Sequence, residues 1–191
     1  MSNRINLLAA AAFAAFAFAS SAVVAPVLAE TTVSVGGAPM YPSKNIIQNA
    51  VNSKDHTTLV AAVKAAGLVD TLQGPGPFTV FAPTNEAFGK LPAGTVDTLL
   101  KTENKPTLTK VLTYHVVPGR MTASNLMKAV KDGGGMAKLT TVEGAELVIK
   151  QAGPGKLSIT DAKGDVATVT IADVLQSNGV IHVVDTVLLP M

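Results

Sequence analysis

His182 and Asp185 are the residues whose types and spacing come closest to acid–base chemistry. They lie in the run Ile181–Asp185, and a histidine oriented by an aspartate is the core of general base catalysis. In a strand, however, successive side chains alternate between the two faces, so His182 and Asp185 should point in opposite directions. No serine motif accompanies them. We therefore expect His182 to be an interior histidine that is hydrogen-bonded across the fold.

The remaining sequence offers little of the chemistry that enzymes use. The three histidines stand at positions 56, 115 and 182, and none is paired with another at metal-ligand spacing. The chain has no cysteine, and it lacks the GxSxG, phosphate-loop and GxGxxG motifs. It also has no tryptophan and no basic stripe, which excludes nucleic acid as the partner. We predict that the protein is not an enzyme and uses no metal or cofactor.

Tyr114 and His115 form a second notable pair, at the end of an amphipathic helix predicted over residues 106–115. Two interpretations stay open. The pair could form an exposed recognition site, or Tyr114 could pack its ring in the interior while His115 satisfies a buried polar partner. The residue types alone favour the second interpretation.

The first 29 residues have the pattern of an export signal. Arg4 is the only charged residue among them, and an apolar run from Leu7 to Ala19 precedes small residues that end at Ala29. This pattern predicts a signal peptide over residues 1–29, cleaved after Ala29, and a secreted or periplasmic protein. The apolar run is shorter than the roughly 20 residues that span a bilayer, and no cysteine is present for lipid attachment. We therefore expect no stable membrane anchor.

The rest of the chain divides into a leader and one domain. Residues 30–42 are rich in Thr, Ser, Gly and Pro without apolar periodicity, which predicts a flexible leader before a domain over 43–191. Helical periodicity dominates the first half of the domain, for example over residues 57–66. Short strand-type runs follow, at residues 138–142, 145–150, 157–160, 166–171 and 180–188. This order predicts an α+β fold whose mainly antiparallel sheet is packed by the N-terminal helices.

The stretch Phe78–Phe88 shows how closely strand and helix follow each other. Its first residues are aromatic and β-branched and predict a strand, which Pro83 ends. The hydroxyl of Thr84 is placed to cap the next helix, and Glu86 falls in the first turn, where the helix dipole favours a carboxylate. A structural role therefore accounts for this stretch.

Two longer motifs resemble the signature boxes of the fasciclin (FAS1) domain family. Thr79–Phe88 resembles the first box and Ser177–Pro190 the second, and Tyr114-His115 stands between them where the family carries a Tyr-His motif. The resemblance covers residues 45–190. It implies a wedge-like β-sandwich flanked by helices and a role in adhesion to cells or matrix. Six residues of the boxes are assigned to the structural motif: Thr84, Asn85, Asn178, Gly179, His182 and Asp185.

The resemblance also implies interaction residues. In animal relatives an Asp-Ile pair shortly before the second box is assigned to integrin recognition, and the matching residues here are Asp173 and Val174. Tyr114 and His115 have a similar assignment. The chain departs from the animal pattern in having Val instead of Ile. From the residues alone, a carboxylate just before the turn at 177–179 is suited to accept turn or cap hydrogen bonds.

These observations predict an exported, non-enzymatic binding module of adhesion type, whose partner is a cell-surface or extracellular-matrix protein or polysaccharide. Two alternatives stay open. With 48% hydrophobic and 15% charged residues, the chain could carry an apolar small molecule or lipid, which needs an apolar cleft on the order of several hundred Å³. It could also be a hydrolase that uses His182 or His115 with a carboxylate at a cleft mouth. The sequence indicates no oligomeric state.

Overall fold

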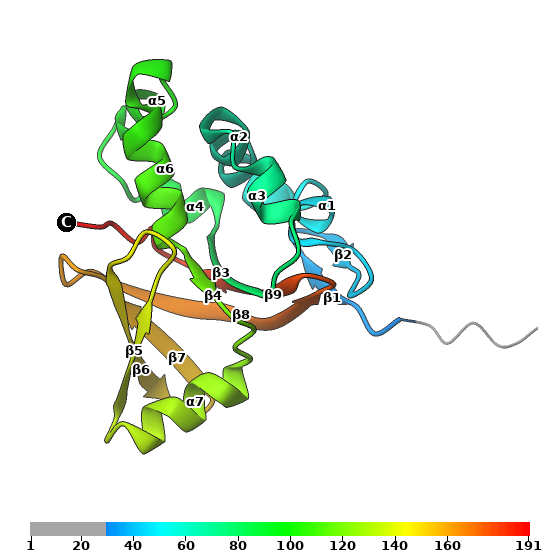
Figure 1. Ribbon diagram of the computed structural model, residues 1–191, viewed down its shortest axis with the longest axis vertical. Helices are drawn as coiled ribbons and strands as arrows, with labels where there is room; N and C mark the ends of the chain where they lie inside the picture. The colour runs from blue at the N-terminus through cyan, green and yellow to red at the C-terminus, as the bar shows by residue number, and fades with distance from the viewer. Residues whose placement is uncertain (1–29) are drawn as a thin grey trace, which may run out of the picture.

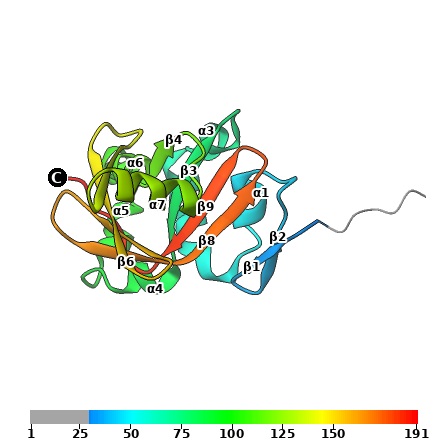
Figure 2. The same cartoon turned by 90° about the horizontal axis from the view of Figure 1, so that it is seen from below.

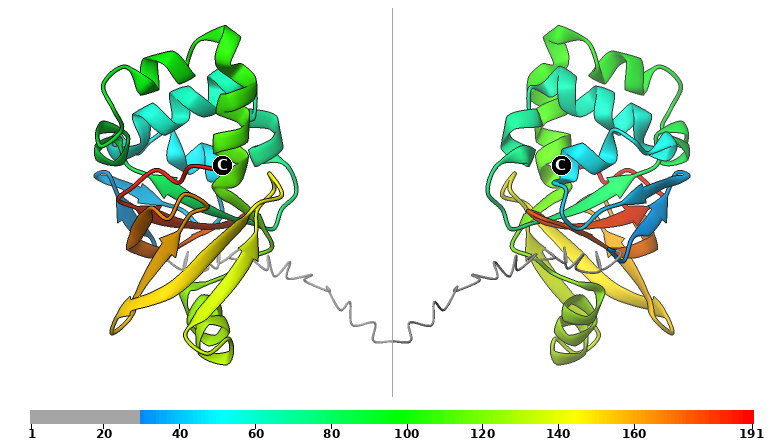
Figure 3. Two further views of the ribbon diagram at one scale, coloured as in Figure 1. Left: turned by 90° about the vertical axis from the view of Figure 1, so that its left-hand side faces the viewer. Right: turned by 90° about the vertical axis from the view of Figure 1, so that its right-hand side faces the viewer.

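The computed structural model describes residues 30–191, and the predicted signal peptide, residues 1–29, lies outside them. A curved sheet forms the middle of the molecule, with most helices on one side and one helix on the other (Figures 1 and 3). The described helices are α1 (Ile46–Ala50), α2 (Thr57–Ala66), α3 (Val69–Gln73), α4 (Asn85–Gly89), α5 (Thr95–Leu99), α6 (Lys105–Tyr114) and α7 (Ala123–Asp132), with 3₁₀ turns η1 (Lys54–His56) and η2 (Thr102–Asn104).

The main sheet has seven strands in the order β4-β3-β9-β8-β7-β6-β5. They are β3 (Phe78–Pro83), β4 (Val116–Pro118), β5 (Met136–Thr140), β6 (Glu146–Gly153), β7 (Lys156–Thr160), β8 (Val166–Gln176) and β9 (Gly179–Val184). Strands β3 and β9 run parallel, and all other neighbours are antiparallel. The sheet curls until the Val142 N–H, just after β5, donates to the Val116 carbonyl of β4 over 2.8 Å. The predicted α+β fold is confirmed.

The helices begin and end at residues with clear local causes. Helix α2 has the predicted bounds, and it ends at Gly67, whose φ of 75° is the left-handed conformation that glycine adopts readily. Helix α7 begins with a reciprocal capping box between Thr122 and Asn125. Helix α6 carries Pro106 in its first turn, where the missing N–H is harmless.

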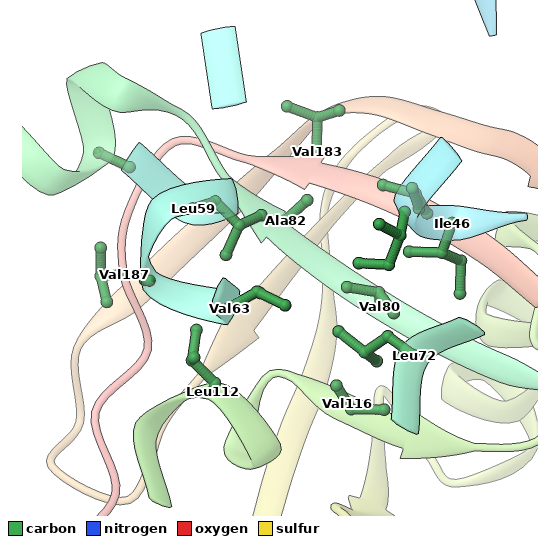
Figure 4. Close-up of a cluster of buried hydrophobic side chains, with 14 of the residues drawn as sticks. Ile46, Leu59, Val63, Leu72, Val80, Ala82, Leu112, Val116, Val183 and Val187 are labelled. Carbon is green, nitrogen blue, oxygen red and sulfur yellow. The ribbon is translucent and has the colours of Figure 1, made fainter. Parts of the chain in front are cut away.

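A first hydrophobic cluster fills the space between the sheet and helices α1 to α6. In Figure 4, Leu59 and Val63 of α2 lie over Val80 and Ala82 of β3, and Leu72, Leu112 and Val116 close the cluster from the side. Burial of aliphatic side chains from both layers is what fixes the helices to the sheet.

A second cluster lies on the other side of the sheet, under α7. Leu126 and Val130 of α7 are buried there against β5 and β6, and the ring of Phe81 from β3 is fully buried in the same cluster. Seen from below, α7 crosses in front of the sheet (Figure 2). The sheet therefore has an apolar layer on both faces, which explains why all six residues of β9 are buried.

The prediction of a flexible leader over residues 30–42 is wrong. Two short strands, β1 (Val33–Val35) and β2 (Ala38–Met40), form a hairpin across Gly36 and Gly37, and both glycines have positive φ. Val35 and Met40 are buried in the first cluster, and β2 contacts α1 and β8 (Figure 2). Strands of three residues are too short to produce a visible periodicity, so the sequence pattern missed them.

Strands β8 and β9 differ most from their predicted lengths. Strand β8 continues to Gln176 instead of ending near residue 171, and its pairing with β9 shifts register between Val169 and Val174. Strand β9 ends at Val184 instead of continuing to residue 188. The register shifts bend the strand and interrupt its alternation, which hides the strand from pattern reading.

Candidate functional site

His182 lies in the middle of β9 and is fully buried. Its Nε2 lies 2.8 Å from the Met121 carbonyl, and the Asp173 N–H lies 3.3 Å from Nδ1. The ring therefore donates from Nε2 and accepts at Nδ1, which is the pattern of a neutral imidazole. Burial lowers the pKa of His182, more than the Met121 carbonyl and Asp173 raise it. Both nitrogens are engaged by backbone groups, so this ring is a structural crosslink.

Asp185 follows the end of β9 and is half-buried. Its Oδ1 accepts the Thr168 N–H over 2.8 Å and the Thr186 hydroxyl over 3.0 Å, and Lys90 lies 3.7 Å from Oδ2. The carboxylate thus ties the chain after β9 to β8. The side chains of His182 and Asp185 form no hydrogen bond with each other, which agrees with the opposite directions expected from strand alternation.

His115 occupies the C-terminal end of α6 and is 2% exposed. Its Nδ1 lies 2.8 Å from the Val111 carbonyl, and its Nε2 accepts the Leu188 N–H over 3.0 Å. Burial lowers the pKa of His115 from 6.5 to about 4, although the Val111 carbonyl and Asp161 act in the opposite direction. This neutral ring joins α6 to the last residues of the second box.

Tyr114 is fully buried in the second cluster. Its hydroxyl donates to the Glu146 carbonyl over 3.0 Å and accepts the Ala162 N–H over 2.9 Å. Burial raises the pKa of this hydroxyl. Val174 is also buried, at 1% exposure. The assignment of Tyr114, His115 and Val174 as interaction residues therefore needs correction: in the folded chain their side chains face the interior, where a partner does not reach them.

Asp173 is the partly exposed member of the predicted interaction set. It sits in the irregular part of β8 with a φ of 56°, a conformation that aspartate tolerates better than most residues. Its carboxylate accepts the N–H of Ala123, the first residue of α7, over 2.7 Å. A negative charge is favourable at this helix end, so the carboxylate is a cap supplied by a distant strand.

Asp173, His182 and Thr79 together hold the chain that leads into α7. Thr79 is buried, and its hydroxyl donates to the Gly119 carbonyl over 2.6 Å and accepts the Met121 N–H over 2.9 Å. In the same segment, His182 Nε2 donates to the Met121 carbonyl, and the Asp173 carboxylate accepts the Ala123 N–H. We call residues 119–123 the α7 entry segment. Its attachment to three different strands fixes where α7 lies on the sheet.

Thr84 and Asn85 connect the end of β3 to two helices. The Thr84 hydroxyl accepts the Ala87 N–H over 3.2 Å and caps α4. The Asn85 amide oxygen accepts the Thr58 N–H over 3.0 Å, and its nitrogen donates to the Lys54 carbonyl over 2.8 Å. Asn85 thereby satisfies an N–H at the start of α2, which has no side-chain cap of its own, and a carbonyl of η1.

Asn178 lies in the turn between β8 and β9, and Gly179 is the first residue of β9. The Asn178 oxygen accepts the Ile46 N–H over 3.0 Å, and its nitrogen donates to the Leu72 and Gly74 carbonyls over 2.8 and 3.0 Å. One side chain thus joins α1 and α3 to the turn. At Gly179 a Cβ atom would collide with the Phe78 carbonyl oxygen, so glycine is required for the close approach of β3.

Removing the Thr84 cap should cost about 1 kcal/mol of the free energy of unfolding. We expect Thr84→Ala to show this loss in urea denaturation, with an unchanged fold, because an N–H of α4 loses its acceptor. Thr107→Ala, at an exposed position of α6, is the matched control and should change stability by less than about 0.5 kcal/mol. Equal losses in both variants would contradict the capping role.

Removing the His182 ring should destabilise the protein by about 1–3 kcal/mol, because the Asp173 N–H and the Met121 carbonyl lose their buried partner. The measurement is the free energy of unfolding of His182→Ala in urea. Lys150→Ala, at an exposed position of β6, serves as the control and should be near neutral. Native-like stability of His182→Ala would show that the ring is not a structural crosslink.

Some polar residues of the interior were missed by sequence reasoning. Asn49 and Gln176 form a buried amide pair that joins α1 to β8, and Asn49 also bonds both backbone groups of Tyr41. Asp161 is buried and accepts backbone N–H groups, including that of Leu189 over 2.8 Å. In the sequence, Asp161 stands in a polar, glycine-containing stretch between two strand-type runs, which is typical of a hairpin loop.

His56 and Ser53 were also missed, and they line a cavity. The cavity lies between β3 and the helical layer, has a volume of about 50 Å³ and is bordered mainly by aliphatic side chains. Ser53 Oγ and His56 Nδ1 lie 2.9 Å apart. Burial lowers the pKa of His56, more than the Ala82 carbonyl and Asp55 raise it.

Residues 30–191 contain neither a cluster of metal-ligand residues nor a helix that could span a membrane. Within this range no three His, Cys, Asp or Glu side chains gather in a way that could hold a metal ion. In the same residues, every helix is too short or too polar to cross a membrane.

Comparison with known proteins agrees with the fold and with the two sequence boxes. The pattern of the family described as Fasciclin domain matches residues 54–190. Protein sll1483 of Synechocystis sp. is 46% identical over 161 residues, which cover 84% of this chain and 82% of that protein. Immunogenic protein MPB70 of Mycobacterium bovis is 34% identical over an alignment of 205 positions, gaps included, which covers 97% of each chain.

Among solved structures, the chain is similar to a FAS1 domain pair from the insect cell adhesion molecule fasciclin I. The TM-score is 0.69 at 20% identity, and the match covers 84% of this chain and 58% of that one. This likeness shows a shared fold, and the chain spans less than two thirds of the domain pair. With the family pattern matched over most of its length, the chain belongs to the fasciclin domain family.

Proposed function

We propose that this protein is an exported, non-enzymatic binding module of adhesion type, which contacts a cell-surface or extracellular-matrix protein or polysaccharide through its outer surface. Membership of a family that includes a cell adhesion molecule is the observation that carries the proposal. Export is supported by the signal-peptide pattern over residues 1–29. The burial of Tyr114, His115 and Val174 favours binding by other, exposed residues.

A hydrolase is less well supported by the histidines. A general base needs a ring nitrogen within hydrogen-bond reach of a substrate proton. Both ring nitrogens of His115 and His182 are occupied by backbone groups, and both rings are buried. His56 is paired with a serine hydroxyl rather than with a carboxylate, and it too is buried.

A lipid carrier is less well supported by the cavity. Sites that enclose drug-sized ligands have volumes of about 300–1,000 Å³, and an acyl chain needs a comparable space. The cavity beside His56 has a volume of about 50 Å³. A long chain would enter only if helices α1, α2 and α3 moved away from the sheet.

The first test is export followed by binding to cells. We expect the protein recovered from the culture medium or periplasm to begin at Glu30, as determined by mass spectrometry. The exported protein, labelled and purified, should bind saturably to intact cells or isolated envelopes of the source organism. Heat-unfolded protein is the control for nonspecific adsorption. Retention of Met1 would refute cleavage after Ala29, and binding equal to that of the unfolded control would refute the adhesion function.

Variants of Asp173 distinguish a role of its carboxylate in partner binding from a role in stability. In Asp173→Asn the amide oxygen can still accept the Ala123 N–H, whereas the negative charge is lost. We expect this variant to bind cells as the native protein does, and Asp173→Ala to lose about 1 kcal/mol of stability through the missing cap. Loss of cell binding by a stably folded Asp173→Asn would instead make the carboxylate a contact residue.

A further inference from the structure

The cavity beside His56 combines an aliphatic wall with one polar atom that lacks a partner. His56 is 3% exposed, and its Nε2 is the buried side-chain nitrogen or oxygen atom without a hydrogen bond in residues 30–191. The Ala82 carbonyl lies close enough to raise the pKa of His56, yet it completes no hydrogen bond with Nε2. A buried polar group left unpaired is unfavourable, so binding of an occupant that pairs with it is favoured.

The hydrogen bond of His56 Nδ1 indicates whether Nε2 is a donor or an acceptor. Ser53 is buried, and its hydroxyl makes its side-chain hydrogen bond with His56 Nδ1. A hydroxyl hydrogen in the interior needs an acceptor, and Nδ1 is the acceptor within reach. With Nδ1 accepting, the neutral ring carries its hydrogen on Nε2. The unpaired atom is therefore a donor, and it calls for an acceptor oxygen.

The wall of the cavity determines that the rest of the ligand must be apolar and uncharged. It includes Leu59 and Val63 of α2, Val80 of β3, and Ile47 of α1, which are buried aliphatic residues. The charged lining residue, Lys64, is exposed and belongs to the rim. A charged group placed at the depth of His56 would be desolvated without a counter-charge, which is strongly unfavourable.

The size and the opening of the cavity limit the ligand further. A water molecule needs about 10–15 Å³ of such volume, and a cavity of about 150 Å³ binds benzene. The volume of about 50 Å³ here suits a molecule of a few non-hydrogen atoms. Partly exposed lining residues, Ala50, Val60 and Val69, place the opening between α1, α2 and α3.

We propose that this cavity is a binding site for a small neutral aliphatic molecule with one acceptor oxygen, such as a ketone, ester or alcohol. The oxygen accepts the hydrogen of His56 Nε2, and the alkyl part contacts the aliphatic wall. This site is separate from the outer surface proposed for adhesion, because it lies between β3 and the helical layer. The two signature boxes give no indication of this small-molecule site.

The test is a titration of the exported protein with 2-butanone, followed by NMR. We expect saturable shifts of the His56 ring ¹⁵Nε2 signal and of the Leu59 and Val63 methyl signals. So few ligand atoms support a dissociation constant on the order of 1 mM. Butyrate and butylammonium, which are charged and of similar size, should leave these signals unchanged at the same concentration.

Two variants distinguish the site from nonspecific contact. His56→Phe keeps an aromatic ring and removes the donor, so ketone binding should weaken at least tenfold. If that variant fails to fold, Ala50→Leu serves instead, since it narrows the opening at a partly exposed position and should also weaken binding at least tenfold. Unshifted His56 signals at saturating ketone, binding of butyrate equal to that of the ketone, or unaltered binding by the folded variants would overturn the proposal. So would a water molecule on Nε2 that the ketone does not displace.

Discussion

Acidification from pH 7 to pH 4.5 should lower the free energy of unfolding by a few kcal/mol, before most carboxylates titrate. His115 dominates this effect, because burial lowers its pKa in the folded protein to about 4, whereas the unfolded chain has the ordinary value of 6.5. The unfolded state therefore binds more protons between these values. The stabilisation from a neutral His115 is complete above pH 6.5 and is lost as the pH falls toward 4.

The magnitude follows from the distance between the two pKa values. A fall from 6.5 to about 4 corresponds to roughly 3 kcal/mol for full titration of His115. His56 and His182 act in the same direction, because burial lowers their pKa values as well. Protonation would also remove the acceptor that Nε2 of His115 offers to the Leu188 N–H.

Urea denaturation at several pH values measures this dependence. The control is His115→Gln, which does not titrate: it should be less stable at pH 7 but should lose less free energy between pH 7 and pH 4.5. The contribution of His115 is the difference between the two slopes. Parallel curves for the native protein and His115→Gln would rule out a lowered pKa at this position.

Replacing Phe81 with alanine should cost about 3–5 kcal/mol of the free energy of unfolding. Phe81 is fully buried in the middle of β3, and its ring stacks on that of His182 with centroids 5.8 Å apart and planes at 26°. The truncation leaves a void between β3, β9 and the second cluster, which rigid strands on both sides cannot close.

Phe78→Ala is the matched control for this substitution, because it removes the same ring from the start of the same strand. Phe78 is only half-buried, so we expect a clearly smaller loss. Urea denaturation of both variants, with thermal unfolding as a second measurement, gives the difference. A cost below about 1.5 kcal/mol for Phe81→Ala would mean that the ring is not part of a closed core.

The parts of the fold that were predictable are those with local causes. Helix α2 has the predicted bounds because its apolar spacing and Gly67 act within a single element. The cap at Thr84 likewise depends on residues three apart. The two boxes identified the family because they extend over many residues of fixed type.

The parts that escaped prediction depend on residues far apart in the chain. Asp173 caps a helix that begins 50 residues earlier, and His115 accepts an N–H from Leu188, 73 residues away. No pattern of neighbours encodes such pairs. The positive φ of Asp173 belongs to an irregular strand pairing, which alternation rules do not describe. The family resemblance implied that Tyr114 and His115 are contacts, whereas their residue types favoured the enclosed positions that the structure shows.

The hydrogen bond between Val142 and Val116 has a consequence for behaviour at high concentration. Sheets with long free edges recruit strands from other molecules, which leads to aggregates and fibrils. Here the two outermost strands, β4 and β5, have three and five residues, and the curl of the sheet brings them together at this bond. Copies of the chain at high concentration would therefore meet through side chains at β4 and β5, and they would not extend the main sheet by backbone pairing.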